Sequence, residues 1–145
     1  MLHTSIGLLM LAMTLIGFTA NANPYSAEHL NCLAQNIYHE SRGEISKGQL
    51  AVAFVTLNRV SSEQFPDSVC SVVYQRGQFT WSNKKKKIRE QEAWERSKEM
   101  ASIAIALYEA GEDNTKGALY FDGGSKLQPY HKHKTVKIGK HSFYQ

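Results

Sequence analysis

The first apolar pattern in the chain that repeats at a helical spacing predicts an amphipathic helix. Leu30, Leu33 and Ile37 recur at spacings of three and four residues, which places them on one face of a helix. Ser26 is a favourable N-cap for this segment. We therefore predict a helix that runs from just after Ser26 to about Ser41.

Glu40 continues the apolar face of this helix, three residues beyond Ile37. A charged carboxylate is too costly to bury alone, so it must find a partner, reach water or carry a raised pKa. A raised pKa is what a general acid needs near neutral pH. Arg42 leaves the helix on another side and is not an automatic ion-pair partner. A helix-end carboxylate that points into solvent is the alternative.

The next helical segment is apolar on nearly every side. Residues 50–60 are almost all hydrophobic until Asn58, which predicts a helix buried in the core. A buried strand is the alternative for so many β-branched residues, but the length of the run favours a helix. Ser46 and Gln49 have the spacing of a capping box at its start.

Two further helices are predicted in the middle of the chain. A short one is expected over residues 67–74, after the turn at Pro66, and a long one over residues 90–110. Residues 76–81 between them are expected to be irregular or extended. The lysine run at 84–87 is typical of a solvated loop, and we expect it to assist encounter with an anionic surface.

The last third of the chain has the pattern of strands. Residues 118–121 and 135–138 are expected to be extended, with Gly-rich residues 122–125 as a turn or loop and residues 141–144 at the end. The expected fold class is therefore α+β and mainly helical, as a single domain with a small β-hairpin region.

The first 22 residues have the features of a secretory signal peptide. An apolar run over residues 6–20 precedes the small residues Ala20 and Ala22, and it is shorter than a membrane-spanning helix requires. The segment before the run contains no Lys or Arg, only His3. We expect cleavage after Ala22, which leaves residues 23–145 as one domain with the formal net charge of +4. The protein is expected in the periplasm, at the cell wall or outside the cell, without stable membrane insertion.

The chain contains two cysteines, Cys32 and Cys70, both after the expected cleavage site. In an oxidising compartment, two cysteines that meet in space form a disulfide. Two buried free thiols are the alternative.

Several kinds of chemistry have no support in the sequence. No glycine-rich nucleotide motif and no nucleophile-elbow pattern occurs. His131, His133 and His141 gather near the end among lysines, but no His-Glu-x-x-His framework accompanies them, so we interpret them as basic loop residues. We expect no metal, no cofactor and no nucleic-acid partner, and we expect a monomer.

Acid chemistry by a carboxylate remains. Glu40 is the best candidate, Glu44 is the nearest second carboxylate, and Asp122 is more distant. Glycosidases commonly use two carboxyl groups, about 5 Å apart in retaining enzymes. Because Gly43 breaks the helix, the sequence leaves the direction of Glu44 open. A mechanism with one acid requires a substrate that supplies its own nucleophile, as muramyl sugars do.

Seven short segments, in order and spread over about residues 30 to 144, resemble the cell-wall hydrolases related to the spore-cortex-lytic enzyme SleB. They are Glu40-Ser41-Arg42-Gly43-Glu44, Gly48-Gln49-Leu50-Ala51-Val52-Ala53, Leu57-Asn58-Arg59-Val60, Val72-Val73-Tyr74-Gln75, Gln78-Phe79-Thr80-Trp81, Gly117-Ala118-Leu119-Tyr120 and Ile138-Gly139-Lys140-His141-Ser142-Phe143-Tyr144.

This resemblance implies a lysozyme-like fold and cleavage of peptidoglycan between N-acetylmuramic acid and N-acetylglucosamine. It implies lytic transglycosylase chemistry, with Glu40 as the general acid and base. Gln78 and Tyr120 match positions expected to line the cleft, and we add Glu44 as a substrate-binding candidate. Cys32 and Cys70 resemble the cysteine pair of Gram-negative members.

The chain departs from the family pattern at two places. His39 and Ser41 flank the glutamate where the family usually has alanine. Pro129-Tyr130 stands where many members have Pro and Trp, and Tyr130 keeps an aromatic face for a sugar ring. A peptidoglycan-binding protein without turnover and an exported protein that binds anionic polymers are the alternative functions.

Overall fold

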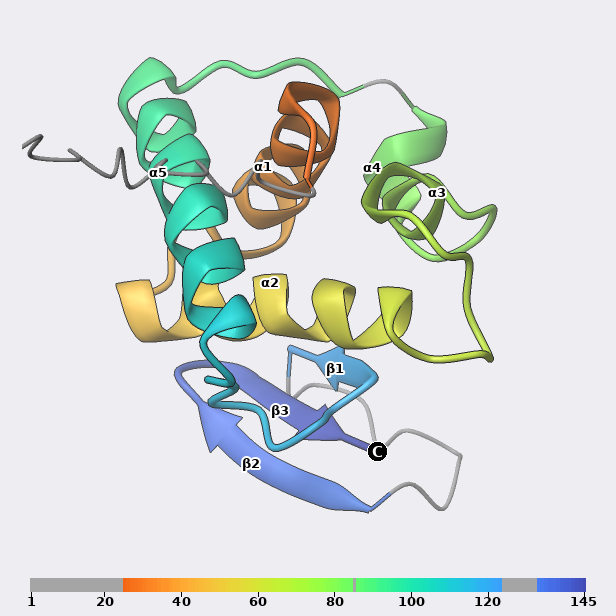
Figure 1. Cartoon of the computed structure of the whole chain (residues 1–145). Coiled ribbons are helices and arrows are strands. Elements are labelled where there is room, and N and C mark those ends of the chain that lie inside the picture. Colours follow the sequence, from red (N-terminus) through yellow and green to blue (C-terminus); the bar gives the residue numbers. More distant parts are fainter. Residues whose placement is uncertain (1–24, 85, 124–132) are drawn as a thin grey trace, which may run out of the picture.

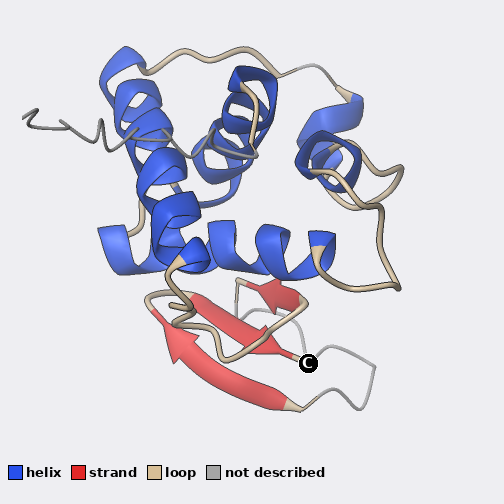
Figure 2. Ribbon diagram, viewed as in Figure 1, coloured by secondary structure: helices blue, strands red, loops and turns tan. Residues whose placement is uncertain are grey.

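The computed structural model describes residues 25–84, 86–123 and 133–145, which form helices and one small sheet (Figures 1 and 2). The helices are α1 (Ala27–Ser41), α2 (Ser46–Val60), α3 (Val69–Val73), α4 (Thr80–Asn83) and α5 (Gln91–Glu109). The strands are β1 (Tyr120–Asp122), β2 (Lys134–Ile138) and β3 (His141–Tyr144). The expected signal peptide, residues 1–22, lies outside the described residues.

Helix α2 lies between the other helices and the sheet (Figure 1). Ala53, Phe54 and Leu57 face the larger core cluster, which they form with residues of α1, α3 and α5. Ala51 and Val55 face the opposite way and pack with Ala118, Ile138 and Phe143, between α2 and the sheet. A helix covered on both sides must be apolar nearly all round, as the sequence of α2 is.

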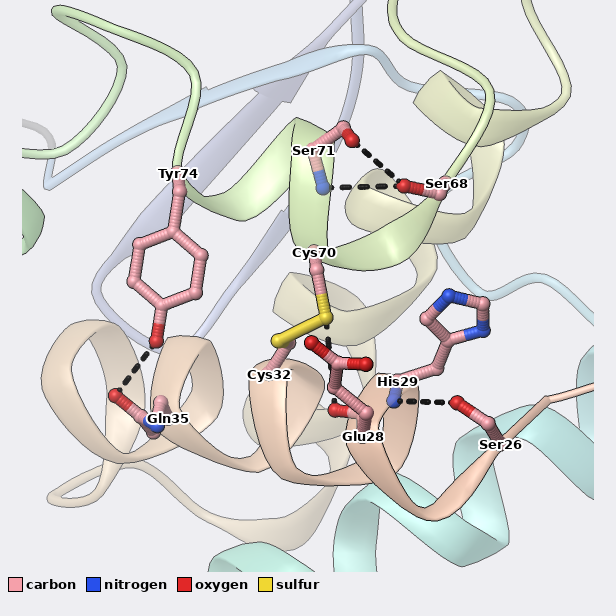
Figure 3. The surroundings of a disulfide bond; sticks show 9 residues. All are labelled: Ser26, Glu28, His29, Cys32, Gln35, Ser68, Cys70, Ser71 and Tyr74. Carbon is pink, nitrogen blue, oxygen red and sulfur yellow. Dashed lines mark hydrogen bonds between the residues drawn. A yellow bond between two sulfur atoms is a disulfide. The ribbon is translucent and has the colours of Figure 1, made fainter.

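Helix α1 is tied to α3 by a covalent bond and by side-chain contacts (Figure 3). Ser26 accepts a hydrogen bond from the His29 amide at 3.2 Å and so acts as the N-cap of α1. A disulfide joins Cys32 to Cys70, which confirms this pairing. The Tyr74 hydroxyl, just after α3, donates to Gln35 Oε1 at 2.9 Å. These links hold α3 beside the middle of α1.

The sheet has the order β1-β3-β2, with both pairs antiparallel. A small hairpin region is present as expected, but it is formed by β2 and β3, and the C-terminal segment, for which no strand was predicted, is the central strand. The first strand begins two residues later than predicted, at Tyr120. Gly139 forms the tight turn with φ +56°, a conformation that favours glycine.

Three local predictions differ from the structure. The proposed capping box does not form, because α2 begins at Ser46 with Ile45 as its N-cap, and Gln49 donates instead to the Glu44 carbonyl at 3.0 Å. The short helix begins at Val69 rather than 67 and has Ser68 as its N-cap. The segment expected to be irregular or extended is irregular over residues 76–79, but its last two residues belong to the helical turn α4 (Thr80–Asn83).

None of the helices in the described part of the chain is long and apolar enough to cross a bilayer.

Candidate active site

Glu40 lies in the last turn of α1, and its carboxylate accepts a hydrogen bond from the indole of Trp81. The distance from Trp81 Nε1 to Glu40 Oε1 is 2.7 Å. Glu40 is partly buried and Trp81, in α4, is buried. This hydrogen bond fixes the direction of the Glu40 carboxyl group, and the neutral indole N–H occupies its Oε1 atom.

The indole of Trp81 is itself held by other rings. The His39 imidazole stacks on it with centroids 4.4 Å apart, and Phe79 lies at 5.8 Å in a similar plane. Tyr74 meets it edge-on at 6.2 Å. Adjacent residues of a helix project to different sides, so the sequence alone assigns His39 no catalytic role beside Glu40. The structure connects the two residues through Trp81.

Burial raises the pKa of the Glu40 carboxyl. The hydrogen bond from Trp81 and the charges of Lys86 and Arg59 act in the opposite direction, and burial prevails. Both charged groups that act on this carboxyl are cations. The result is an acid that keeps its proton to a higher pH than an exposed glutamate, with cations nearby that stabilise the anion once the proton has left.

Arg59, near the end of α2, brings together two residues that the sequence singled out. Its Nη1 donates to Gln78 Oε1 at 2.8 Å, and its Nε donates to the Leu119 carbonyl at 2.7 Å. The guanidinium carbon lies 5.6 Å from the centre of the Tyr120 ring. Burial lowers the pKa of Arg59 to about 10, so the group stays charged at neutral pH. Gln78 and Tyr120 thus contact one buried cation, which also acts on the charge of Glu40.

Glu44 is directed toward the sheet. Its Oε2 accepts a hydrogen bond from the Lys140 amide at 3.2 Å, in the turn between β2 and β3. A Cβ at Gly139 would overlap this carboxylate, and one at Gly48 would lie 3.1 Å from Glu44 Cβ. Glu44 also acts electrostatically on the buried His141. Its contacts within the described residues are therefore with the β2–β3 turn, whereas those of Glu40 are with α4.

Two cavities open near the end of α1. The basic cavity has a volume of about 550 Å³ and is lined by five cations and one carboxylate: Arg42, Lys84, Lys86, Lys87, Arg89 and Glu90. Tyr38 and His39 complete its wall. The aromatic cavity, about 460 Å³, is lined by Trp81, Tyr74, Gln35, Ser82, Lys86 and Lys87.

These cavities change the interpretation of the lysine run. Lys84, Lys86 and Lys87 are exposed loop residues, as expected, but they line cavities next to the candidate acid rather than only facing solvent. Glu40 is not among the described residues that line either cavity. Its carboxylate is joined to the aromatic cavity through Trp81.

The histidines near the C-terminus do not share one environment. His133 is exposed, as expected of a loop residue, whereas His141 is buried in β3, which corrects the interpretation of His141 as a loop residue. Burial lowers the pKa of His141, while Glu44 and Asp122 act to raise it. Within residues 25–84, 86–123 and 133–145, no three His, Cys, Asp or Glu side chains gather in a metal-binding group.

The sequence profile of the cell wall hydrolases matches residues 43–144. The chain belongs to this family. The matched segment begins just beyond Glu40, so the profile itself does not include the candidate acid.

One relative is the spore cortex-lytic enzyme of Bacillus cereus. Its sequence is 35% identical to this chain over 124 residues, which cover 83% of the chain and 46% of the relative. The spore cortex-lytic enzyme of Bacillus subtilis is 32% identical over 82% of the chain and 38% of the relative. The chain thus spans less than half the length of these two relatives.

Two solved structures of catalytic domains resemble this chain over nearly their whole length. The catalytic domain of Bacillus cereus SleB matches with a TM-score of 0.70 and 33% identity, covering 89% of this chain and 98% of that one. The catalytic domain of SleB from Bacillus anthracis, described as a germination-specific lytic transglycosylase, matches with a TM-score of 0.71, covering 86% and 99%. The expected fold, mainly helical α+β and lysozyme-like, is confirmed.

Sequence reasoning missed three residues around Glu40, namely Arg59, Trp81 and Lys86. Arg59 could have been predicted from the sequence as a buried, hydrogen-bonded cation, because an arginine within an otherwise apolar helix needs hydrogen-bond acceptors. Trp81 stood inside a segment expected to be irregular or extended, and nothing in its spacing pointed to Glu40. Tyr130, the remaining candidate, lies outside the described residues.

Proposed function

We propose that this protein cleaves the glycan strands of peptidoglycan between N-acetylmuramic acid and N-acetylglucosamine, with Glu40 as the catalytic acid. The observation that carries this proposal is the partly buried Glu40 carboxyl, which is held by Trp81 and has a raised pKa. The family membership supports the substrate, and the likeness to the SleB catalytic domains supports the reaction.

The reaction that fits a single acid is an intramolecular transglycosylation. Glu40 donates its proton to the glycosidic oxygen, and the bond between that oxygen and C1 of the muramyl sugar breaks. The C6 hydroxyl oxygen of the same sugar then bonds to C1 and returns its proton to the Glu40 carboxylate. The products are a 1,6-anhydromuramyl end and a free N-acetylglucosamine end, and no water is consumed.

The directions of the two glutamates favour this route over hydrolysis with two carboxylates. Glycosidases with two carboxyl groups place both of them across the scissile bond. Here Glu40 is held by Trp81 and Glu44 accepts from Lys140 in the β2–β3 turn, so the two carboxylates have different partners. The charges acting on Glu40 are cations, which favour the anion formed after proton transfer.

Gln78 and Tyr120 are proposed to contact the sugar chain, with Arg59 as the group that orients them. An aromatic ring offers an apolar face to a sugar ring. Tyr130 and Glu44 remain further candidates for substrate contact.

Mass spectrometry of digested sacculi tests the proposal. Transglycosylation predicts soluble fragments that end in anhydromuramic acid, whereas hydrolysis yields reducing ends that are one water heavier. Intact sacculi that retain the protein without releasing fragments would instead favour a binding function. That alternative has one observation in its favour, the basic cavity.

We also propose that residues 1–22 direct export and that residues 23–145 act as a monomer in the periplasm, at the cell wall or outside the cell. The expected mature protein begins at Asn23. N-terminal sequencing of secreted protein that begins at Met1 would contradict this processing, and size-exclusion chromatography of the mature form checks the monomer.

A further inference from the structure

The basic cavity has a strong local excess of positive charge. It is lined by five cations and one carboxylate, a surplus of four positive charges. The neighbouring His39 has its pKa lowered, by burial first and then by Arg42 and Lys86, so it adds no charge at neutral pH. A cavity with this charge favours anions.

The cavity wall is built by fixed contacts rather than by loose side chains alone. The Tyr38 hydroxyl accepts hydrogen bonds from the amides of Arg89 and Glu90 at 3.0 and 3.1 Å. Arg42 donates from Nε to Glu90 Oε1 at 2.8 Å and from Nη1 to the Tyr38 carbonyl at 3.2 Å. The segment that leads from α4 to the start of α5 crosses the top of the view in Figure 1. These bonds fasten its far end to α1.

Some of the cations that line the basic cavity are not paired with a carboxylate. The one carboxylate, Glu90, is already paired with Arg42. Among the described residues, Lys84, Lys87 and Arg89 form no ion pair. Three cations at the cavity are thus available to a ligand.

The cavity lies beside the candidate acid. His39 lines it and precedes Glu40 in the chain, and its imidazole stacks on the indole that binds the Glu40 carboxylate. Lys86 lines both cavities and acts on the charge of Glu40. Two residues of the cavity wall thus connect the basic cavity to the Glu40 carboxylate.

We propose that the basic cavity binds the carboxylates of the peptide attached to the muramyl residue that is cleaved, which makes the protein selective for glycan strands that carry acidic peptides. This inference rests on the proposed function, because it takes peptidoglycan as the substrate. N-acetylglucosamine carries no charge, and the lactyl carboxyl of a muramyl sugar that bears a peptide is taken up in an amide bond, so the charge lies on the peptide. The peptide branches from the same muramyl sugar whose C1–O bond breaks, and it bears several carboxylates.

Direct binding of a soluble acidic stem tripeptide tests the inference without any cleavage. The test variant combines Lys84→Ser, Lys87→Ser and Arg89→Ser. The matched control combines Lys47→Ser, Arg76→Ser and Lys137→Ser, which removes the same charge from exposed positions outside both cavities. Because each contact is partly exposed, we expect tripeptide affinity to fall about tenfold in the test variant. We expect little change in the control at matched ionic strength.

A second measurement uses turnover. The ratio of kcat/KM on intact sacculi to kcat/KM on glycan stripped of peptides by an amidase, which leaves one lactyl carboxylate on each muramyl sugar in place of the peptide's carboxylates, should exceed one in the native protein. It should fall toward one in the cavity variant and stay high in the control.

Three results would overturn the inference: equal tripeptide affinity in the native and cavity variants, equal loss in the control, or undiminished binding of a tripeptide whose carboxylates are amidated. These results can be distinguished from a failure of the proposed function. In that case glycan cleavage is absent, but binding of the tripeptide can still be measured.

Discussion

Trp81 donates a hydrogen bond of 2.7 Å from its indole nitrogen to Glu40 Oε1, which joins α4 to the last turn of α1. Forty-one positions separate these residues in the chain. The bond leaves the other carboxylate oxygen for a substrate, while the buried indole limits how far the carboxyl can rotate. The predicted chemistry depends on this arrangement.

Glu40→Gln should abolish most glycan cleavage while the protein stays folded. The amide oxygen still accepts from Trp81, but the proton for the glycosidic oxygen is gone, so we expect at least about a hundredfold loss. Fragment release from sacculi measures the effect. Glu44→Gln is the matched control, with a smaller loss expected because its amide oxygen can still accept from Lys140. Near-normal cleavage by a folded Glu40→Gln protein would end the assignment.

The same variant makes a prediction about stability. Since the pKa of Glu40 is raised in the folded state, the folded protein binds this proton more tightly than the unfolded chain does. Stability is therefore lost as pH rises from the ordinary glutamate pKa through the raised one. Glu40→Gln removes this loss, so at neutral pH it should be at least as stable as the native protein in urea unfolding. A clear destabilisation at neutral pH would contradict the raised pKa.

Trp81→Phe should slow cleavage and move its pH profile. Loss of the indole donor frees the carboxyl, and misplacement of a catalytic group costs about tenfold to a hundredfold. The bond from Trp81 lowers the pKa of Glu40, so its removal raises that pKa further. Because the protonated form is the acid, the decline of kcat at high pH should shift to higher pH. Trp94→Phe, at a partly buried ring in α5, is the control and should leave the profile in place.

Arg59→Met should destabilise the protein by about 1–3 kcal/mol, because the Leu119 carbonyl and Gln78 Oε1 lose a charged donor. Cleavage should also fall, since Gln78 and Tyr120 lose their common partner. The free energy of unfolding from urea titration and the rate on sacculi measure the two effects. Arg76→Met, at an exposed arginine, should change neither by much. Equal stability and equal cleavage rates of the two variants would contradict a role for Arg59 in the site.

The Cys32–Cys70 disulfide should stabilise the fold without taking part in the reaction. Its cysteines are 38 positions apart, and closing such a loop contributes about 4 kcal/mol in the chain-entropy model. The double change Cys32→Ser with Cys70→Ser should lower the free energy of unfolding by up to that amount. Cleavage at a temperature where the variant stays folded should be retained. Thiol labelling of native protein before and after reduction checks the bond, and ready labelling without reductant would disprove it.

The sequence by itself determined the helices α1 and α2 and identified Glu40 as the proposed acid. The spacing of Leu30, Leu33 and Ile37 and the N-cap at Ser26 are local features, so α1 follows the predicted bounds. The almost continuous apolar run of α2 required burial on both sides, which the structure provides between the helices and the sheet. Glu40 stood out because a carboxylate on an apolar face needs an explanation in any fold.

Only the tertiary structure decided which groups surround that acid. Trp81, Arg59 and Lys86 lie far from Glu40 in the chain, and no periodicity reports a contact over such separations. The direction of Glu44 depended on the turn at Gly139, where the absence of a side chain leaves room for the carboxylate. The lysine run lines a cavity because Tyr38 and Arg42 bind the start of α5. Helix periodicity reflects backbone geometry within a few residues, whereas a site is assembled by packing between distant segments.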